Sequence, residues 1–172
     1  VPPWINKFYV FDLSPEKSVA RFLLRNGIQT FVVSWRNPTK AHREWGLSTY
    51  IEALKEAIDV VSAVTGSKDI NMLGACSGGL TTTSLLGHYA ALGEKKVHAL
   101  TLLVSVLDNR LETDVALFAD EKSLEMAKRR SYQAGVLEGK DMAKVFAWMR
   151  PNDLIWNYWV NNYLLGNEPP VF

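Results

Sequence analysis

The residue best suited to take part in a chemical reaction is the chain's one cysteine, Cys76. It stands in the run Gly-Ala-Cys-Ser-Gly-Gly at positions 74–79, a G-x-C-x-G pattern. An apolar run precedes it and a helical pattern follows, so Cys76 is expected at a tight turn between a strand and a helix. This is the setting of a nucleophile elbow, where flanking glycines allow the sharp turn and the nucleophile stands clear of the backbone. The alternative is a buried, inert cysteine beside a glycine-rich turn.

Two backbone groups are candidates for an oxyanion hole around this cysteine. The N–H of Ser77 lies at the start of the expected helix, where the helix dipole also favours a thiolate. A second N–H is expected from the loop Pro-Pro-Trp-Ile-Asn at positions 2–6, in which Trp4 or Ile5 could donate. The prolines cannot donate, but they stiffen the loop. An ordinary proline-rich surface turn explains this loop equally well.

A nucleophilic cysteine needs a base, and the chain has three histidines, at positions 42, 88 and 98. His88 lies well into the helix after the elbow, roughly 18 Å from its start by helical rise. His98 begins a strand, opposite the end where sites form in parallel sheets. His42 lies in a polar loop and is expected to be solvated. Asp108, at the end of a strand, is a candidate acid, although it would equally well cap the following helical block.

Composition limits the function further. The 172 residues are 48% hydrophobic and 22% charged, which is typical of a globular chain. The net charge of +1 argues against nucleic-acid binding, and no apolar run approaches the length of a membrane span. A single cysteine excludes an internal disulfide and a cysteine-based zinc site. The strand-like opening and the lack of a closing element suggest part of a longer protein.

The order of apolar runs and helical patterns predicts an α/β fold. Runs without clean alternation suit strands buried on both faces, so a mostly parallel sheet with right-handed helical crossovers is expected. Thr49 with Glu52 is interpreted as a capping box. The expected strands are 8–13 (a strand or extended loop), 30–35, 69–75 and 97–107, and the expected helices are 14–26, 49–66, 78–92, 121–133, 140–150 and 153–165.

The predicted elements divide the chain in two. Residues 1–108 read as a partial α/β core that contains the elbow. Residues 109–172 read as helices without an intervening strand, which is typical of a cap over an active site, although a separate helical layer would look the same.

The whole chain resembles the catalytic domain of polyhydroxyalkanoate synthases, and specifically the type II synthases that take medium-chain monomers. The cysteine followed by Ser77 carries the subtype, because short-chain enzymes usually have valine there. The resemblance rests on four blocks in the same order, which are PPWINKFY at 2–9, SWRNP at 34–38, GACSGG at 74–79 and RPNDLIWNYW at 150–159.

This resemblance implies an α/β-hydrolase fold (here partial) with a helical cap insertion, and an acyltransferase that polymerises (R)-3-hydroxyacyl-coenzyme A. Cys76 would carry the acyl group as a thioester, and Trp156 would belong to the apolar cap surface. The family's catalytic Asp and His would follow Phe172, so residues 1–172 alone are expected to be inactive. No cofactor is implied, since acyl-coenzyme A is a substrate. Implied partners are the growing polyester, a second subunit and granule-associated proteins, at the surface of cytoplasmic granules.

Two other functions remain open at this point. One is a thiol hydrolase of the same fold, similar to dienelactone hydrolase, in which water resolves the acyl intermediate. The other is a non-catalytic member of the fold that acts as a scaffold. The aromatic helix around Trp156 could line a dry tunnel, but it could equally be core packing or a dimer contact.

Overall fold

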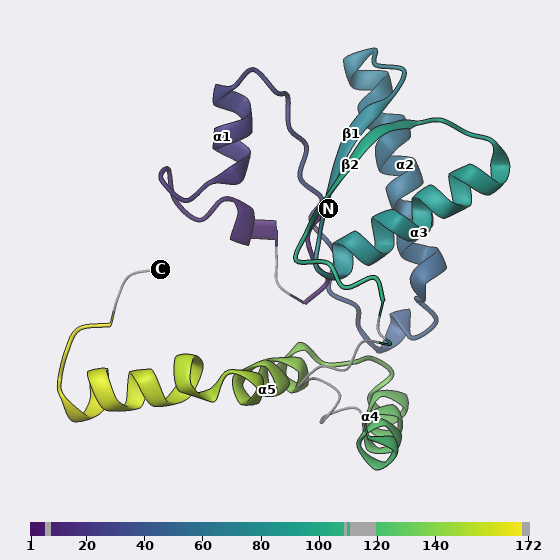
Figure 1. The fold of residues 1–172 in the computed structure, drawn as a ribbon. Helices are drawn as coiled ribbons and strands as arrows, with labels where there is room; N and C mark the ends of the chain where they lie inside the picture. The colour runs from purple at the N-terminus through teal and green to yellow at the C-terminus, as the bar shows by residue number, and fades with distance from the viewer. Residues whose placement is uncertain (6–7, 109, 111–119, 170–172) are drawn as a thin grey trace. The chain divides into compact units, whose positions relative to one another are not determined.

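The computed structural model describes residues 1–5, 8–108, 110 and 120–169 (Figure 1). The chain divides into two compact units. The first contains Val1–Pro38 and His42–Asn109, and the second contains Thr39–Ala41 and Arg110–Phe172. The assignment of the second unit as a cap stays a prediction.

The first unit contains a parallel pair of strands. Strand β1 (Ile70–Ala75) pairs in parallel with β2 (Val97–Leu103), and helix α3 (Ser77–Leu92) connects them. Ala75, the last residue of β1, lies opposite Leu103, the last residue of β2. Both strands therefore end at the same edge, where the elbow begins. The predicted strand–helix–strand order and parallel pairing are confirmed.

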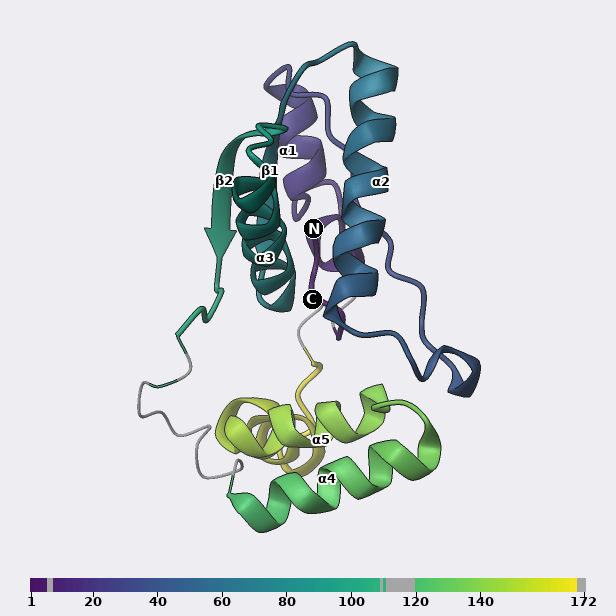
Figure 2. The same ribbon diagram turned by 90° about the vertical axis from the view of Figure 1, so that its right-hand side faces the viewer.

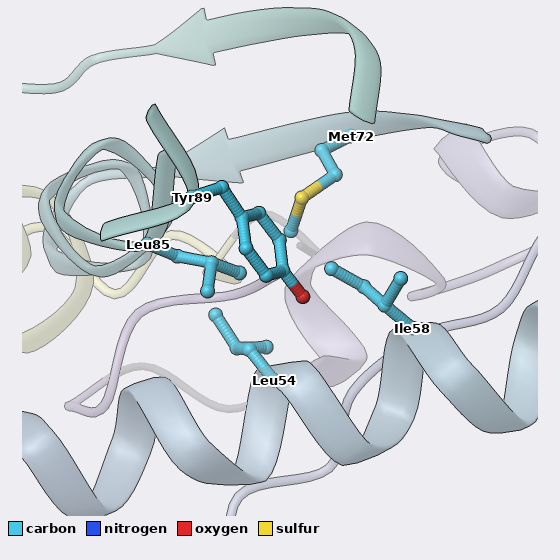
Figure 3. Packing of buried hydrophobic residues seen from close by; sticks show 5 residues of the cluster. All are labelled: Leu54, Ile58, Met72, Leu85 and Tyr89. Atoms are coloured by element: carbon cyan, nitrogen blue, oxygen red, sulfur yellow. The ribbon is translucent and has the colours of Figure 1, made fainter. Parts of the chain in front are cut away.

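Two helices build the core of this unit. Helix α3 packs on the strands, and α2 (Leu47–Thr65) packs against α3 (Figure 2). The buried apolar cluster between them comes from α2, β1 and α3, and its side chains converge in Figure 3; they are Leu54, Ile58, Met72, Leu85 and Tyr89. The glycines that follow these helices, Gly66 and Gly93, both take left-handed backbone conformations. The core thus fixes α3, whose first turn carries the elbow.

Leu85 is the core position at which truncation is expected to cost most, because its exposed fraction is 0%. We expect Leu85→Ala to lower the free energy of unfolding of the intact protein by about 2–5 kcal/mol, through lost burial and a residual cavity. Leu92→Ala is the matched control, since Leu92 lies on the same helix but is 57% exposed, and its effect should be small. Denaturant unfolding followed by circular dichroism measures both. Equal losses for the two variants would contradict this core assignment.

Two expected strands are not strands in the structure. Phe8–Phe11 forms a 3₁₀ helix, because the chain closes a local turn in which Asp12 N donates to Tyr9 O at 2.9 Å. Residues 30–35 are extended but unpaired, since the sheet within the described residues consists of β1 and β2. A strand needs a neighbour for its ladder of hydrogen bonds. Val33 and Trp35 nevertheless pack against the core from this segment.

Two helix starts also differ from the prediction. Helix α1 (Val19–Arg25) is capped by Ser18, whose Oγ accepts from Arg21 N at 2.8 Å, whereas Ser14 closes the preceding turn. Helix α2 begins at Leu47 after Gly46, so the predicted capping box of Thr49 and Glu52 is wrong. Glu52 instead pairs with Lys55 one turn later, at 3.1 Å. The Ser18 hydroxyl thus sets the start of α1, whereas no side-chain hydrogen bond caps α2.

Strand β2 is shorter and more exposed than predicted. It ends at Leu103 rather than at residue 107, and Val104 follows with a φ of 45°. A positive φ in a β-branched residue interrupts the extended backbone. None of its residues is buried, so the expected burial on both faces does not hold for β2.

The second unit is helical. Asp120 caps α4 (Glu121–Ala134) by accepting from the amides of the first turn, and α5 (Gly139–Met149) follows. The helix expected over 153–165 is present, but most of it is π-helical, in the segments Asn152–Trp156 and Trp159–Leu164, with two α-helical residues between them. In the first, the Asn157 amide donates to Asn152 O, five residues back, so the turn is wider than in an α-helix. Among the helices described, none is long and apolar enough to cross a membrane.

Candidate active site

Cys76 occupies the turn between β1 and α3 with a strained backbone. Its φ of 51° and ψ of −122° lie outside the common regions for a residue with a side chain. Such strain persists only where the surroundings hold it, and it concentrates at functional sites. Cys76 is half-buried and is a free thiol. The strand, the strained cysteine and the helix together form the geometry of a nucleophile elbow.

Close backbone approach explains the glycines around Cys76. A Cβ on Gly74 would lie 2.8 Å from the Cα of Gly79, and a Cβ on Gly79 would lie 2.6 Å from the Cβ of Ser105. Real Cβ atoms essentially never approach so closely, so neither position has room for a side chain. These contacts let the first turn of α3 sit against the ends of β1 and β2. The expectation that glycines are needed for a tight turn therefore has a steric basis here.

Hydrogen bonds fix the elbow to the sheet and to its own helix. The Cys76 amide donates to Leu103 O, the end of β2, at 3.0 Å. The Cys76 carbonyl accepts from Gly79 N at 2.9 Å. The first N–H groups of an α-helix have no partner within the helix, and Ser77 is the first residue of α3. The Ser77 N–H is therefore suited to hold a negative oxygen beside Cys76.

The opening residues of the chain lie against the same elbow. Val1 runs along β1 on the side away from β2, with Val1 N donating to Leu73 O at 2.7 Å and Ala75 N donating to Val1 O at 3.1 Å. This is the hydrogen-bond pattern of a parallel strand neighbour. The loop that follows is consequently delivered to the edge at which Cys76 lies. Sequence analysis placed the loop near the elbow but gave no sign of this pairing.

The loop is held by two further hydrogen bonds. The Trp35 indole Nε1 donates to Pro2 O at 2.9 Å. The Trp4 amide donates to the Ser77 Oγ at 3.0 Å. Of the two predicted loop donors, Trp4 thus has its N–H directed at the residue that follows the nucleophile. The structure brings Trp4, Ser77 and the elbow together; whether Trp4 or Ile5 serves an oxyanion stays a prediction.

An aromatic cluster supports this loop from α2. The Tyr50 ring lies 5.0 Å from the Trp4 ring and 5.2 Å, edge to face, from the Trp35 ring. Burial raises the pKa of the Tyr50 hydroxyl, which keeps the ring neutral. Trp35 and Tyr50 were not predicted to support the site. The only earlier sign was the presence of Trp35 in one of the four family blocks.

The histidines lie at different places in the first unit. His98, near the start of β2, faces Asp69 at 3.8 Å and is at the opposite end of the strand from the elbow. His88 is on α3 with its Nε2 buried and without a hydrogen-bond partner. The His42 ring lies 4.1 Å from the Trp45 ring and is tilted by 45° to it. None of these contacts joins a histidine to Cys76.

The remaining predicted site residues lie outside the elbow. Asp108 is half-buried in the segment after β2, and its role as an acid stays a prediction. Trp156 ends the first π-helical segment and is 55% exposed. Within the described ranges, no group of three or more His, Cys, Asp or Glu side chains is arranged to hold a metal ion.

Comparison with known proteins decides the family. A model of the alpha/beta hydrolase fold matches residues 10–172, nearly the whole chain. The chain belongs to the alpha/beta hydrolase fold family. The fold class predicted from the sequence is therefore confirmed, and the elbow geometry of Cys76 is what this family's nucleophile requires.

Within this alpha/beta hydrolase family, the chain is similar to polyester-forming enzymes. It is 80% identical to poly(3-hydroxyalkanoate) polymerase 1 and 58% identical to poly(3-hydroxyalkanoate) polymerase 2, both of Ectopseudomonas oleovorans, over its whole length. It is 41% identical to the poly(3-hydroxyalkanoate) polymerase of Methylorubrum extorquens. These matches cover 100% of this chain but 31%, 31% and 29% of the relatives, so the chain spans about a third of their length. The resemblance drawn from the four sequence blocks is confirmed.

Proposed function

We propose that the intact protein polymerises (R)-3-hydroxyacyl-coenzyme A into polyhydroxyalkanoate through a covalent thioester on Cys76. The observation that carries this proposal is the strained backbone of Cys76 between β1 and α3. The names of the relatives supply the polymer class. The serine after the nucleophile supports medium-chain monomers, by the resemblance to type II synthases.

In the first half-reaction, the Cys76 thiolate attacks the thioester carbonyl of the substrate. A carbon–sulfur bond forms, and the carbonyl oxygen becomes an oxyanion that the Ser77 N–H and a loop N–H stabilise. The oxyanion collapses, the bond to coenzyme A breaks, and the departing thiolate takes up a proton. One thioester replaces another, so the acyl group stays activated. An ester on serine would be a poorer donor for the next step.

In the second half-reaction, the hydroxyl of another hydroxyacyl group attacks the Cys76 thioester. An ester bond forms, the bond between the acyl carbon and the Cys76 sulfur breaks, the hydroxyl proton passes to the base, and the Cys76 thiolate is released. By the resemblance, the general base is a His and its acidic partner is an Asp, and both would follow Phe172; Asp108 is the candidate acid within the chain. The elbow supplies the nucleophile and one oxyanion donor, the Ser77 N–H.

A direct test incubates the intact protein with (R)-3-hydroxyacyl-coenzyme A and follows coenzyme A release, acylation of Cys76 by peptide mass spectrometry, and the product. We expect an acyl group on Cys76 and polyester as the main product. Free hydroxy acid in place of polyester would favour the thiol hydrolase, which the family match also supports. No acylation of Cys76 at all would favour the non-catalytic scaffold.

The exposed aromatic residues of the second unit suit an apolar ligand. Trp156, Trp159 and Tyr163 are 55%, 48% and 71% exposed, and the last two rings stack at 4.5 Å. We propose that Trp156 contacts acyl chains or polymer, in keeping with the apolar cap surface that the family resemblance implies. The same chemistry supports a place for the intact protein at the surface of cytoplasmic polyester granules, with a second subunit and granule-associated proteins as partners. Imaging a fluorescent fusion of the intact protein in polyester-producing cells tests that location.

We expect Trp156→Ala to lower polymerisation more than His42→Ala or His88→Ala, because the His42 ring contacts Trp45 and His88 lies in the second half of α3, whereas Trp156 offers apolar surface. Trp148→Ala is the matched control, since Trp148 is also a tryptophan of the second unit and is 67% exposed. Initial rates of coenzyme A release measure all four variants. Loss of activity in a normally folded His88 variant would place the general base within this chain and contradict the interpretation.

A further inference from the structure

The Ser77 side chain makes a contact that is separate from the oxyanion role expected of the Ser77 N–H. Its Oγ accepts a hydrogen bond from the Trp4 amide at 3.0 Å, across 73 positions of sequence. Ser77 is the first residue of α3, directly after the nucleophile. The side chain therefore links the elbow to the loop that is expected to supply the second oxyanion donor. A shift of one end would be transmitted directly to the other.

The other fixed points of the loop leave a specific task for Ser77. Val1 is held along β1, and Pro2 O is held by Trp35 Nε1 at 2.9 Å. Both hydrogen bonds are made by residues that precede Trp4 in the sequence. The prolines of the loop have no N–H, so they cannot donate further hydrogen bonds that would hold it. The Trp4 ring packs on Tyr50, but a ring contact restrains a backbone amide less than a hydrogen bond does. The hydrogen bond to Ser77 orients the peptide between Pro3 and Trp4, from which the loop continues to Ile5.

We propose that the Ser77 hydroxyl is a positioning residue that fixes the Pro3–Trp4 peptide, and with it the start of the segment that leads to Ile5, against the nucleophile elbow. Because the Trp4 N–H is committed to Ser77, the Ile5 N–H becomes the loop donor for the oxyanion. Such donors act only when they are aimed in advance at the place where negative charge develops. Ser77 thus contributes twice to one site, with its own N–H as a donor and with its hydroxyl as the restraint on the second donor. This inference rests on the proposed acyl chemistry at Cys76.

The matched pair Ser77→Thr and Ser77→Val tests the hydroxyl, because these two side chains have nearly the same shape and only threonine keeps the acceptor. In the intact protein, we expect Ser77→Val to slow acylation of Cys76 by (R)-3-hydroxyacyl-coenzyme A about 10-fold relative to Ser77→Thr. This is less than the roughly 10² to 10³-fold loss for removal of a whole oxyanion donor. Rapid-quench measurement of the first coenzyme A released gives the acylation rate.

Alkylation of Cys76 by iodoacetamide separates positioning from a general structural effect, since this displacement passes through no oxyanion. We expect the alkylation rates of the two variants to agree within about twofold while their acylation rates differ, as the oxyanion argument requires. Equal acylation rates, or a parallel loss in both reactions, would overturn the proposal.

A second readout does not depend on the proposed function. Hydrogen exchange of the Trp4 amide should be faster in Ser77→Val than in Ser77→Thr, because only threonine keeps the acceptor. Unchanged protection would overturn the inference even if acylation changes. If wild-type protein is not acylated by the coenzyme A substrate, the proposed function fails. The exchange rates and acylation by a p-nitrophenyl ester then still decide the role of Ser77.

Discussion

Cys76→Ala in the intact protein is expected to abolish both acyl-enzyme formation and polymerisation. Cys76 is the one cysteine of the chain, and its backbone is held at a φ of 51° that presents the side chain at the tip of the elbow. Removing a nucleophile removes the covalent route itself, so the loss should approach the roughly 10⁶-fold seen when a hydrolase nucleophile is deleted. Coenzyme A release and intact-protein mass spectrometry measure the two effects.

Cys76→Ser is the matched control for this prediction. The hydroxyl keeps the size and position of the nucleophile, but it is a weaker nucleophile than a thiolate and its ester is a poorer acyl donor. We expect at most a trace of polymer from the serine variant. Substantial polymer from Cys76→Ala would refute the assignment of the nucleophile, whereas comparable turnover by Cys76→Ser would refute only the argument for a thioester.

The parts of the fold that the sequence predicted well are those set by local patterns that the core reinforces. The apolar run of β1, the helical pattern of α3 and the glycine at Gly93 all specify the same structure, and Met72 and Leu85 are buried together. The segment at 30–35 has equally strong strand composition, but strand formation depends on a neighbour at the right edge. Composition carries no information about that neighbour.

The candidate site was likewise predictable where it depends on local sequence and not where it depends on tertiary contacts. The elbow could be predicted because its requirements are local: glycines, a nucleophile, and a strand and a helix on either side. The support from Trp35 and Tyr50 could not be predicted, since both reach the loop only through tertiary contacts with Pro2 and Trp4. The π-helical segments around Trp156 were missed because their residues have the same apolar spacing as an α-helix over a few turns.

The second prediction of large effect concerns Gly78, where the elbow and the loop meet. A Cβ added there would lie 2.7 Å from Pro2 O and 2.9 Å from Pro2 C, and closer still to Val1 O. These are backbone atoms that cannot rotate away. Val1 O already accepts from Ala75 N, and Pro2 O accepts from the Trp35 indole, so moving them breaks two hydrogen bonds. Gly78 is required by its neighbours rather than by its own backbone conformation.

We therefore expect Gly78→Ala to displace the loop from the elbow and to lower the rate of Cys76 acylation by about 10² to 10³-fold, the cost of losing one oxyanion donor. Overpacking should also lower the free energy of unfolding by about 1–3 kcal/mol. Rapid-quench acylation and denaturant unfolding measure these losses.

Gly87→Ala is the matched control for Gly78→Ala, because Gly87 lies on the same helix with nothing within 4 Å of an added Cβ. Alanine there should leave acylation unchanged and stabilise the helix by about 0.5–1 kcal/mol, since glycine is the poorer helix former. The two substitutions add the same methyl group to one helix and differ only in what the methyl meets. If Gly78→Ala acylated as fast as Gly87→Ala, close packing of the loop on the elbow would not be what aligns the site.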